Sequence, residues 1–519
     1  MSAPMLQVEG LTLSLGGQAV LADVGFEVAG GEILGLVGES GSGKSLTALS
    51  ILRLLPAGAA VSGAVRLDGR DLISLPEAAM RPVRGGQIGL IFQEPMTALN
   101  PVMTIGDQVA EVFRIHRRAG RSEALREAAN ALARAGLPPA EIPPTRYPHE
   151  LSGGQRQRVA IALATALKPG LVIADEPTTA LDVTTQAQIL ELLKGLAHRD
   201  GAGLILITHD LAAVSGMADR VAVMRGGRIV EAGPTQQVLA GLGDPYAGIA
   251  VTPRSPSTAL PVLEARDVVR TYPGRRAGWR RGADFRAVDG VSLRLQPGER
   301  LGLVGESGSG KSTLLRALLA LEPPQSGEIR LDDQPFGASA TRAQRSAIQA
   351  VFQDPYGSFD PRWRVEDLVA EPLHLLATPP RGAERRERVA AMLGQVGLPA
   401  EAADRYAHQF SGGQRQRIAI ARALITQPRV VILDEAVSAL DVPVRAEILR
   451  LLARLSDDLG LAYVFVTHDL TVARAVTDRL MVMKAGRIVE EGPTAEIFAA
   501  PKHPYTAALI AATPRMASL

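Results

Sequence analysis

The sequence has no cysteine among its 519 residues. This excludes disulfide bonds, thiolate zinc sites and cysteine-ligated iron–sulfur clusters, and it suits a reducing compartment. No uncharged apolar run approaches the ~20 residues that a membrane-spanning helix needs. The first residues, MSAPMLQVEGLTLSL, lack a basic region, so we expect no secretory signal. We therefore expect a soluble chain that depends on partners for any work in a membrane.

Positive and negative charges are also nearly balanced in the sequence. The formal net charge is +2, which gives no support to a nucleic-acid partner. Hydrophobic residues make up 46% of the chain and charged residues 21%, which is usual for a globular protein. A chain of this length can form about two to four domains with full cores.

A glycine-rich turn stands in residues 33–52, ILGLVGESGSGKSLTALSIL, between an apolar run and a helical pattern. It fits the pattern G-x-x-x-x-G-K-S/T, with Gly38, Gly43, Lys44 and Ser45 at the fixed positions. Glycines let backbone N–H groups approach a phosphate, and the following helix directs its positive dipole end at the same anion. Lys44 can then reach the β- and γ-phosphates of a nucleotide, while the Ser45 hydroxyl can bind Mg²⁺.

The same turn occurs again. Residues 301–318 read LGLVGESGSGKSTLLRAL and place Gly305, Gly310, Lys311 and Ser312 in the same roles. One copy could be a chance glycine loop at the start of a helix, but two copies exclude that interpretation. Later motifs also recur at one constant separation, which is far too long for a solenoid repeat and indicates domain duplication.

The duplication predicts a first domain over residues 1–251, a linker over 252–261 and a second domain over 262–519. The linker, TPRSPSTALP, is rich in proline and serine. In each half, short strands and turns come first, and a helical region follows at about 95–150 and 355–408. Apolar strands then alternate with helices. Strands this apolar are usually buried on both faces, so we expect an α/β fold with a mostly parallel sheet.

Each half has two adjacent carboxylates at the end of an apolar strand, Asp175-Glu176 and Asp434-Glu435. At the carboxyl ends of parallel strands these residues can face the phosphate loop. We expect the aspartates to support the Mg²⁺ shell and the glutamates to orient or polarise the attacking water. An isolated acidic pair can instead cap the next helix.

Two more polar residues at strand ends argue against a capping role alone. Gln93 and Gln353 follow an earlier strand, and His209 and His468 follow a later one. A glutamine carbonyl can bind Mg²⁺ or hold water, and a neutral histidine can hydrogen-bond the γ-phosphate. A lone histidine is more often structural, but the same strand-end position in both halves favours a role in catalysis.

A second anion-binding device lies in the runs LSGGQRQRVAIA (151–162) and FSGGQRQRIAIA (410–421). Each combines a hydroxyl, closely approachable backbone and the start of a helix. Two phosphate loops and two such helix starts suggest a face-to-face pairing, in which the serine run of one half completes the phosphate loop of the other.

Together these motifs are highly specific, and the chain resembles a tandem ATP-binding-cassette ATPase over essentially its whole length. The matching runs are GESGSGKS, IFQE and VFQD, LSGGQ and FSGGQ, IADE and ILDE, TTALD and VSALD, and ITHD and VTHD. The resemblance implies two P-loop NTPase domains, each with a mainly parallel sheet core, an antiparallel β part and a helical subdomain. It also implies ATP and Mg²⁺ as cofactors, and ATP hydrolysis coupled to transmembrane transport.

The resemblance assigns residues to two nucleotide sites, each built from both halves. The nucleotide-binding residues of the first site are Leu15, Gly38, Ser40, Gly41, Gly43, Lys44 and Ser45, with Ser411, Gly412, Gly413 and Gln414 from the second half. Those of the second site are Tyr272, Gly305, Ser307, Gly308, Gly310, Lys311 and Ser312, with Ser152, Gly153, Gly154 and Gln155. The catalytic residues are Glu176, His209 and Gln93 in the first site and Glu435, His468 and Gln353 in the second. The metal ligands are Ser45, Gln93 and Asp175, and Ser312, Gln353 and Asp434. Asp182 and Asp441 would be the aspartates that cross between the halves.

Neither half has lost a catalytic position, so we expect two competent sites. One departure separates them. The family places an aromatic residue ahead of the phosphate loop to stack on adenine, and Tyr272 matches it, whereas the aligned residue of the first half is Leu15. Leucine can pack on a base but has no π-face, so the first site is expected to bind nucleotide more weakly or to use another contact.

The subfamily is visible as well. QEPMTALNPVMTIGDQ and ADEPTTALDVT resemble the first ATPase of dipeptide/oligopeptide importers, and QDPYGSFDPRWRV and LDEAVSALDVPVR resemble the second. The tail HPYTAALIAATPR resembles the terminal segment of that group, with a shorter counterpart at 244–254. The resemblance implies the energy-coupling subunit of an importer for peptides or peptide-like solutes. It would lie on the cytoplasmic face of the inner membrane, against two integral-membrane permease subunits, with an extracytoplasmic solute-binding protein delivering the solute.

Other functions fit the motifs less well. An importer of the same family could carry nickel, glutathione or an antibiotic peptide, and the ATPase sequence does not distinguish these solutes. A tandem-cassette translation factor would have a long charged helical linker, where this chain has a short one rich in proline and serine. DNA-repair cassettes need cysteine zinc sites. The arginine-rich run at 272–286 could contact lipid headgroups or nucleic acid, but its position favours a solvated loop.

Overall fold

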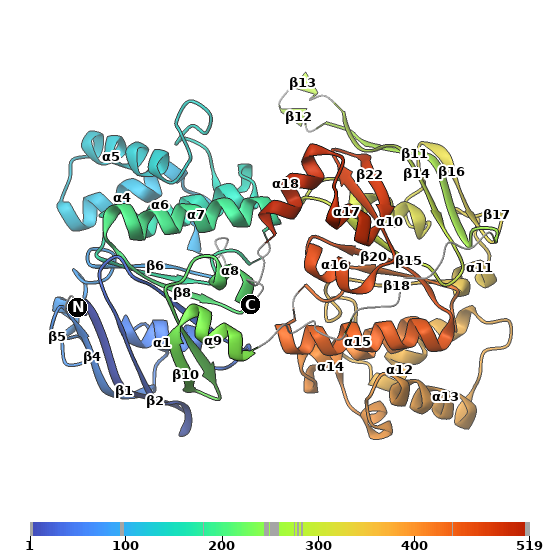
Figure 1. Ribbon diagram of the computed structural model, residues 1–519, viewed down its shortest axis with the longest axis horizontal. Coiled ribbons are helices and arrows are strands. Elements are labelled where there is room, and N and C mark those ends of the chain that lie inside the picture. Colours follow the sequence, from blue (N-terminus) through green and yellow to red (C-terminus); the bar gives the residue numbers. More distant parts are fainter. Residues whose placement is uncertain are drawn as a thin grey trace. The chain divides into compact units, whose positions relative to one another are not determined.

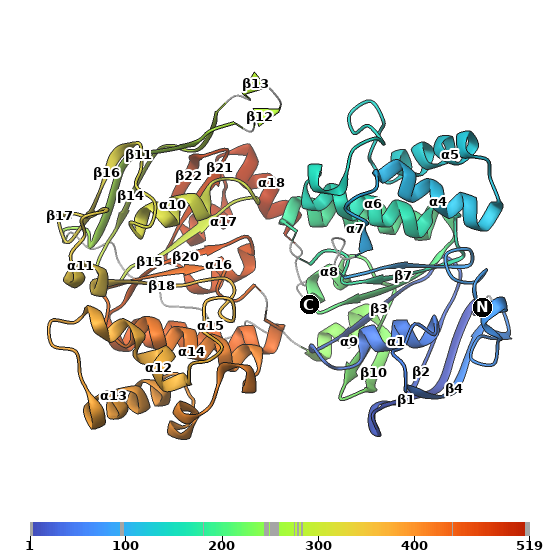
Figure 2. The same cartoon turned by 180° about the vertical axis from the view of Figure 1, so that it is seen from behind.

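The computed structural model (Figures 1 and 2) describes residues 4–93, 98–179, 181–242, 249, 259–274, 276–277, 280–281, 284–438 and 440–513. These residues divide into two compact units, one within residues 1–244 and the other within 245–513. Most of the predicted linker and most of the 244–254 run lie outside the described residues.

A six-stranded sheet forms the centre of the first unit, in the order β10-β9-β3-β8-β7-β6. Its strands are β3 (Ile33–Gly38), β6 (Ile88–Ile91), β7 (Leu171–Asp175), β8 (Gly203–Thr208), β9 (Arg220–Arg225) and β10 (Arg228–Pro234). All neighbours pair in parallel except β9 and β10, which are antiparallel. Every residue of β7 and β8 is buried, as their apolar sequences predict.

Different layers cover the two faces of this sheet (Figure 1). On one face, Ile161 of α6 (Gly153–Thr165) and Ile189 of α7 (Val183–Asp200) pack in one core with Ile33 of β3. On the other face lie α1 and an antiparallel sheet in the order β2-β1-β4-β5. These elements are α1 (Lys44–Ile51), β1 (Leu6–Leu15), β2 (Gln18–Val28), β4 (Ala60–Leu67) and β5 (Arg70–Asp71).

A helical subdomain adds a separate core to the first unit. Phe113 of α4 (Ile105–Arg117) and Leu132 of α5 (Arg121–Arg134) pack together with Val159 of α6. The remaining helices of the unit are α2 (Glu77–Met80), η1 (Pro148–Glu150), α8 (Leu211–Ser215) and α9 (Thr235–Leu242). The helix-forming sequence predicted at about 95–150 is thus the source of this subdomain.

The second unit repeats the architecture, with a six-stranded sheet in the order β22-β21-β15-β20-β19-β18 and an antiparallel sheet in the order β14-β11-β16-β17. The strands are β11 (Leu263–Tyr272), β14 (Phe285–Leu295), β15 (Arg300–Val304), β16 (Ser326–Leu331), β17 (Gln334–Pro335), β18 (Ile348–Val351), β19 (Val430–Asp434), β20 (Ala462–Thr467), β21 (Arg479–Lys484) and β22 (Arg487–Pro493). The helices are α10 (Lys311–Leu318), α11 (Arg342–Ala347), α12 (Val365–Ala370), η2 (Glu371–Leu375), α13 (Gly382–Gln395), η3 (Ala400–Asp404), η4 (Ala407–Gln409), α14 (Gly412–Leu424), α15 (Val442–Leu459), α16 (Leu470–Val476), α17 (Thr494–Ala499) and α18 (Pro504–Ala512). The predicted fold class, a mainly parallel sheet with an antiparallel part and a helical subdomain in each half, is confirmed.

Two smaller features complete the second unit. Within the arginine-rich run, β12 (Arg276–Ala277) and β13 (Arg280–Arg281) pair as a short antiparallel ribbon, and other residues of the run lie outside the described part. At the other end, Tyr505 and Leu509 of α18 pack against Val304 of β15. The C-terminal segment is therefore part of the core of this unit.

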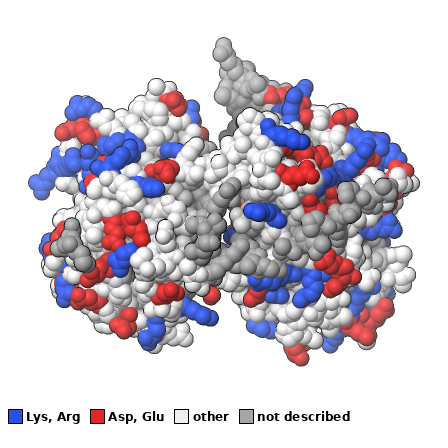
Figure 3. Space-filling view, in the orientation of Figure 1, with Lys and Arg blue, Asp and Glu red and all other residues white. Residues whose placement is uncertain are grey.

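Among the described residues, no helix combines the length and the apolarity that crossing a membrane requires. In the view of Figure 3, Lys and Arg lie interspersed with Asp and Glu over both units. This mixture agrees with the small net charge of the chain.

Candidate active site

The structure places both sets of predicted loop residues between the central strand of a sheet and the helix that follows. Gly38, Ser40, Gly41, Gly43, Lys44 and Ser45 lie at the junction of β3 and α1, and Gly305, Ser307, Gly308, Gly310, Lys311 and Ser312 lie at the junction of β15 and α10. In both units the strand before the loop is buried, so the loop is held rigidly at the carboxyl end of the sheet.

The ends of the first loop require glycine. Gly43 has a φ of 102°, and a Cβ there would lie 2.5 Å from the Leu21 side chain. A Cβ on Gly38 would lie 2.2 Å from the carbonyl oxygen of Met224. A Cβ on Gly41, by contrast, would meet no described atom within 4 Å. The loop is tightly packed at its ends and open at its middle, where an anion can approach the backbone N–H groups.

The loop lysines are buried and bonded to their own loops. Lys44 is 5% exposed, and its Nζ donates to the carbonyl oxygens of Gly38 and Glu39, each at 2.7 Å. Lys311, equally buried, donates to the same two positions of the second loop at 2.7 and 2.8 Å. Each ammonium group is thereby fixed beside the backbone that would surround a phosphate.

In the first unit, three polar side chains converge on the carboxylate of Glu176, the residue after β7. Thr179 Oγ1 and Gln93 Nε2 each donate to it at 2.9 Å, and Nδ1 of His209 lies 3.1 Å from it. Burial raises the pKa of Glu176, but the hydrogen bonds from His209 and Thr179 outweigh burial and hold it below its ordinary value. Glu176 is therefore a half-buried, ionised carboxylate.

Beside it, the hydroxyl of Ser45 donates to Oδ1 of Asp175 at 3.1 Å. Burial raises the pKa of Asp175, and the hydrogen bond from Ser45 opposes that rise. A hydroxyl and a carboxylate thus lie together at the start of α1. Both are oxygen ligands of the kind that Mg²⁺ prefers when it also binds nucleotide phosphates. No cluster of three or more acidic, histidine or cysteine side chains suited to a metal occurs in the part of the chain that the structure describes.

The second unit has the same residues with fewer contacts. Nδ1 of His468 lies 3.3 Å from Oε1 of Glu435, and although burial raises the pKa of Glu435, this histidine lowers it below its ordinary value. Ser438, at the position of Thr179, donates to the backbone carbonyl of Glu435 at 2.9 Å instead of to the carboxylate. Burial and the charge of Glu435 raise the pKa of Asp434 to about 6.

The two Ser-Gly-Gly-Gln runs form matching helix starts. Ser152 caps α6, where its Oγ accepts from the Gln155 N–H at 3.3 Å and its own N–H donates to Gln155 Oε1 at 3.0 Å. Ser411 and Gln414 make the same two bonds at the start of α14, at the same lengths. The sequence interpretation assigned both glutamines to the nucleotide and overlooked this capping box, although the spacing Ser-x-x-Gln was a signal for it.

The second glycine of each run has a packing role. A Cβ on Gly154 would lie 2.4 Å from Thr185 Cγ2, and a Cβ on Gly413 would lie 2.3 Å from Val444 Cγ1. These glycines let each capped helix approach the next one closely. Asp182 caps that next helix in the first unit, accepting from Thr185 N–H at 3.0 Å. Asp441 stands at the start of α15 without such a side-chain bond.

Comparison with known proteins identifies the family. Residues 21–179 and 288–438 match the family described as ABC transporter, and residues 489–518 match the oligopeptide/dipeptide transporter C-terminal region. The two cassette matches together span more than half of the chain.

This chain belongs to the ATP-binding-cassette ATPases.

Its relatives include the glutathione import ATP-binding protein GsiA of Escherichia coli O157:H7, which is 47% identical over 96% of this chain and 86% of the relative. The peptidoglycan transport ATP-binding protein YejF of Agrobacterium fabrum is 46% identical over 98% of this chain and 96% of the relative. A dimeric cassette structure, MJ0796 bound to ADP and Pi, is 32% identical and covers 45% of this chain and 98% of its own, with a TM-score of 0.40. Because that TM-score is low, the family assignment rests on the sequence matches.

These comparisons confirm the predicted family, a tandem ABC ATPase of the dipeptide/oligopeptide importer group. The chain binds ATP, is an ATPase by family, and works with membrane permease partners.

The positions predicted to face adenine differ between the two cassettes. Leu15 ends β1 and packs against the core of the antiparallel sheet. Tyr272 ends β11, where its hydroxyl donates to Glu322 at 2.7 Å and the guanidinium of Arg270 lies 5.2 Å from its ring centroid. The tyrosine ring is therefore held in one orientation, and the leucine is part of a hydrophobic cluster.

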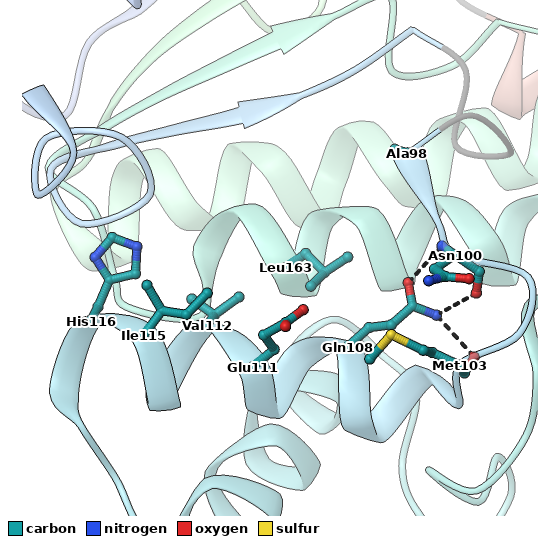
Figure 4. Close-up of a pocket in the computed structure, with 9 residues that line it drawn as sticks. All are labelled: Ala98, Asn100, Met103, Gln108, Glu111, Val112, Ile115, His116 and Leu163. Atoms are coloured by element: carbon teal, nitrogen blue, oxygen red, sulfur yellow. Dashed lines mark hydrogen bonds between the residues drawn. The ribbon is translucent and has the colours of Figure 1, made fainter. Parts of the chain in front are cut away.

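A pocket of about 290 Å³ lies beside α4 in the first cassette (Figure 4). It is lined by Ala98, Asn100, Met103, Gln108, Glu111, Val112, Ile115, His116 and Leu163. The Gln108 amide fixes one end of it, because its Oε1 accepts from Asn100 N–H at 2.9 Å and its Nε2 donates to the carbonyls of Asn100 and Met103, each at 3.0 Å. Ala98 is the first lining residue in sequence and follows Gln93 by five residues.

Proposed function

We propose that this ATPase drives import of a peptide or a peptide-like solute such as glutathione, from the cytoplasmic face of the inner membrane. The observation that carries the proposal is the half-buried, ionised Glu176 beside a complete phosphate loop, in a chain whose C-terminal region matches the oligopeptide/dipeptide group. The relatives named for glutathione import and peptidoglycan transport support a peptide-like solute. A solute-binding protein outside the membrane would deliver it to two permease subunits.

In the first site, Glu176 orients the attacking water and accepts its proton. Its pKa below the ordinary value keeps it ionised, and the bonds from Gln93 and Thr179 fix its orientation. Nδ1 of His209 lies on the same carboxylate, and the doubly protonated ring, which also carries a proton on Nε2, can donate to Glu176 and to the γ-phosphate at once. Lys44 supplies the charge that stabilises the phosphates. Glu435, His468 and Lys311 have the same roles in the second site.

Mg²⁺ fits the oxygen atoms that meet beside each loop. Ser45 and Asp175 would hold it in the first site, with the Gln93 Oε1 that the bond to Glu176 leaves available. Ser312, Asp434 and Gln353 would hold it in the second. When bound, Mg²⁺ neutralises charge that develops on the phosphates. The protein oxygens orient the nucleotide toward the water held by the glutamate.

Each site would be completed by the Ser-Gly-Gly-Gln run of the other cassette. Support comes from the exposed serine at the start of each thirteen-residue helix, where the N–H groups of a helix start favour an anion. In the capping box the serine hydroxyl only accepts, so its proton is still available to donate to the nucleotide, together with the backbone N–H groups of the glycines.

The test uses the full chain reconstituted with its permease subunits in vesicles loaded with ATP, with the solute-binding protein and a set of peptides added outside. We expect Lys44→Ala and Lys311→Ala each to remove most ATP turnover and solute uptake, since each deletes the charge that stabilises the phosphates. The solute itself is identified as the ligand that co-purifies with the binding protein. Uptake of nickel alone, with no peptide transported, would contradict the peptide proposal.

We also propose that the pocket beside α4 receives a permease segment. Ile115, which is 67% exposed, and the half-buried Met103, Val112 and Leu163 line it together, and contiguous apolar surface of this kind marks interaction sites. A segment seated there would contact Ala98, five residues after Gln93, whose amide contacts Glu176. Ile115→Asp should reduce co-purification with the permease at least ~tenfold while ATP binding is retained. The matched control is Leu125→Asp, an exposed apolar residue of α5 outside the pocket, and equal losses in both variants would reject this docking site.

A further inference from the structure

A single peptide group of the second phosphate loop is held from both ends. The carbonyl oxygen of Gly305 accepts from Lys311 Nζ at 2.7 Å. The N–H of the same peptide group, that of Glu306, donates to the hydroxyl of Tyr505 at 3.0 Å. Rotation of this peptide group would therefore break both bonds, and the C-terminal helix α18 and the loop lysine depend on the same backbone plane.

Tyr505 is itself fixed in place. It is 7% exposed and packs with Val304, Leu480 and Leu509, while Nζ of Lys484 lies 4.5 Å from its ring centroid. Its hydroxyl is therefore a rigid acceptor and does not swing freely at the end of a side chain.

The start of α18 is anchored to the sheet as well. Glu490 of β22 accepts from the N–H groups of Lys502 and His503 at 2.8 and 3.0 Å. His503 Nδ1 in turn accepts from the Tyr505 N–H at 3.1 Å. The run His-Pro-Tyr is thus the stretch that brings the tyrosine hydroxyl to the loop.

We propose that Tyr505 is a positioning residue of the second nucleotide site, through which the C-terminal helix holds the loop in the conformation that places Lys311. The inference rests on the proposed role of Lys311 in binding nucleotide. The match to the family's C-terminal region covers this residue but assigns it no role. The corresponding segment after the first cassette lies mostly outside the described residues, so the proposal concerns the second site.

The test is Tyr505→Phe in the full chain, which removes the hydroxyl and keeps the ring. Photolabelling with an azido-ATP, followed by mapping of the labelled peptides, reports each cassette separately. We expect about fivefold weaker labelling affinity in the second cassette, the effect of one lost hydrogen bond, and unchanged affinity in the first.

The matched control is Tyr463→Phe. This tyrosine is also buried in the second unit, and its hydroxyl donates to the Val476 carbonyl, away from the loop. It should lower the melting temperature as Tyr505→Phe does but leave nucleotide affinity at the parent value. A Tyr505→Phe affinity equal to that of the parent, or equal losses in the two variants, would overturn the positioning role.

Lys311→Ala separates this inference from the proposed function. If Lys311→Ala abolishes labelling of the second cassette while Tyr505→Phe leaves it unchanged, the positioning role alone is wrong. If labelling of the second cassette survives Lys311→Ala, the assignment of the nucleotide site itself is wrong, and with it this inference.

Discussion

The catalytic carboxylates of the two cassettes are supported differently. Glu176 receives hydrogen bonds from Thr179 and Gln93 and lies against His209. Glu435 lies against His468, but Ser438 turns its hydroxyl to the backbone carbonyl. The added methyl group of threonine restricts its rotamers, whereas serine can turn to the nearer backbone acceptor. Two corresponding motifs that differ by one hydroxyl-bearing residue thus hold the same carboxylate with different numbers of bonds.

The aspartates beside these glutamates also differ, and again the first cassette has the additional hydrogen bond. Ser45 donates to Asp175 and opposes the rise that burial causes in the pKa of this aspartate. No such bond joins Ser312 to Asp434 among the described residues, and burial with the neighbouring Glu435 raises the pKa of Asp434 to about 6. The comparison indicates that the first site is the more pre-organised of the two, although it lacks the aromatic residue.

The largest expected effect comes from removing each glutamate. Glu176→Gln and Glu435→Gln should each reduce ATP turnover about 100-fold or more at the altered site, because an amide cannot accept the proton of water. Nucleotide binding should remain, since the side chain keeps its size. Single-turnover hydrolysis and equilibrium binding measure the two quantities, and Glu191→Gln, an exposed change on α7, serves as the control.

The double variant should trap an ATP-bound form of the protein. Near-normal turnover in either single variant would show that only one of the two carboxylates works, which would end the comparison of two competent sites.

The second largest effect is expected from substitutions of the serines that are proposed to complete the site of the other cassette. Ser411→Arg should weaken nucleotide binding at the Lys44 loop by at least ~tenfold, or about 1.4 kcal/mol, because bulk and charge replace a small hydroxyl. Ser152→Arg should do the same at the Lys311 loop. Nucleotide photolabelling mapped to each loop measures both. Damage confined to the cassette that carries the substitution would contradict composite sites.

A smaller effect is expected from removing the hydroxyl groups that support the two catalytic glutamates differently. Thr179→Ala removes a hydrogen bond to a charged group, about 1.5 kcal/mol, and should lower turnover at the first site about tenfold. Ser438→Ala should change the second site less than about twofold, because its hydroxyl does not reach the carboxylate. Each variant is measured with the other site inactivated by its glutamate-to-glutamine change. Equal losses of turnover in the two variants would show that the hydrogen bond from Thr179 to Glu176 does not contribute to catalysis.

Much of this arrangement follows from local sequence. The apolar strands that end at Asp175 and Thr208 predict parallel neighbours, so Glu176 and His209 had to meet at one edge of the sheet. The glycines of the phosphate loops were predictable because the pattern fixes where positive φ and close contacts are needed. Local patterns thus sufficed for the fold class and for most of the catalytic cluster.

Contacts that join distant segments were not predictable in this way. The bond between Tyr505 and Glu306 spans 199 residues and depends on how α18 packs against β15. Thr179 donates to a glutamate carboxylate, whereas Ser438 donates to a backbone carbonyl. This difference depends on side-chain rotamers, which the motif does not determine. Gly154 and Gly413 are explained by a neighbouring helix, whose approach is a property of the packed unit.

The smallest expected effect concerns Leu15 and Tyr272. Stacking of a base on an aromatic ring contributes about 1 kcal/mol at the lower end of its range, or about fivefold in affinity. The structure holds the Tyr272 ring in place through Glu322 and Arg270, so no further ordering of this side chain is needed when adenine binds. Leu15→Tyr should tighten the first site about fivefold, and Tyr272→Ala should loosen the second by the same factor.

Calorimetric titration of the Glu176→Gln, Glu435→Gln protein with ATP measures both affinities. Tyr272→Phe is the matched control, because it keeps the ring and loses only the bond to Glu322, so its affinity should stay within about twofold of the parent.

The competing explanation is that another aromatic residue already stacks in the first site. Phe26 is the nearest candidate in sequence, but it is 8% exposed within the core of the antiparallel sheet and cannot reach a base without unfolding it. Two indistinguishable sites in the parent, with no response to Leu15→Tyr, would reject the affinity difference while leaving the difference in carboxylate support intact.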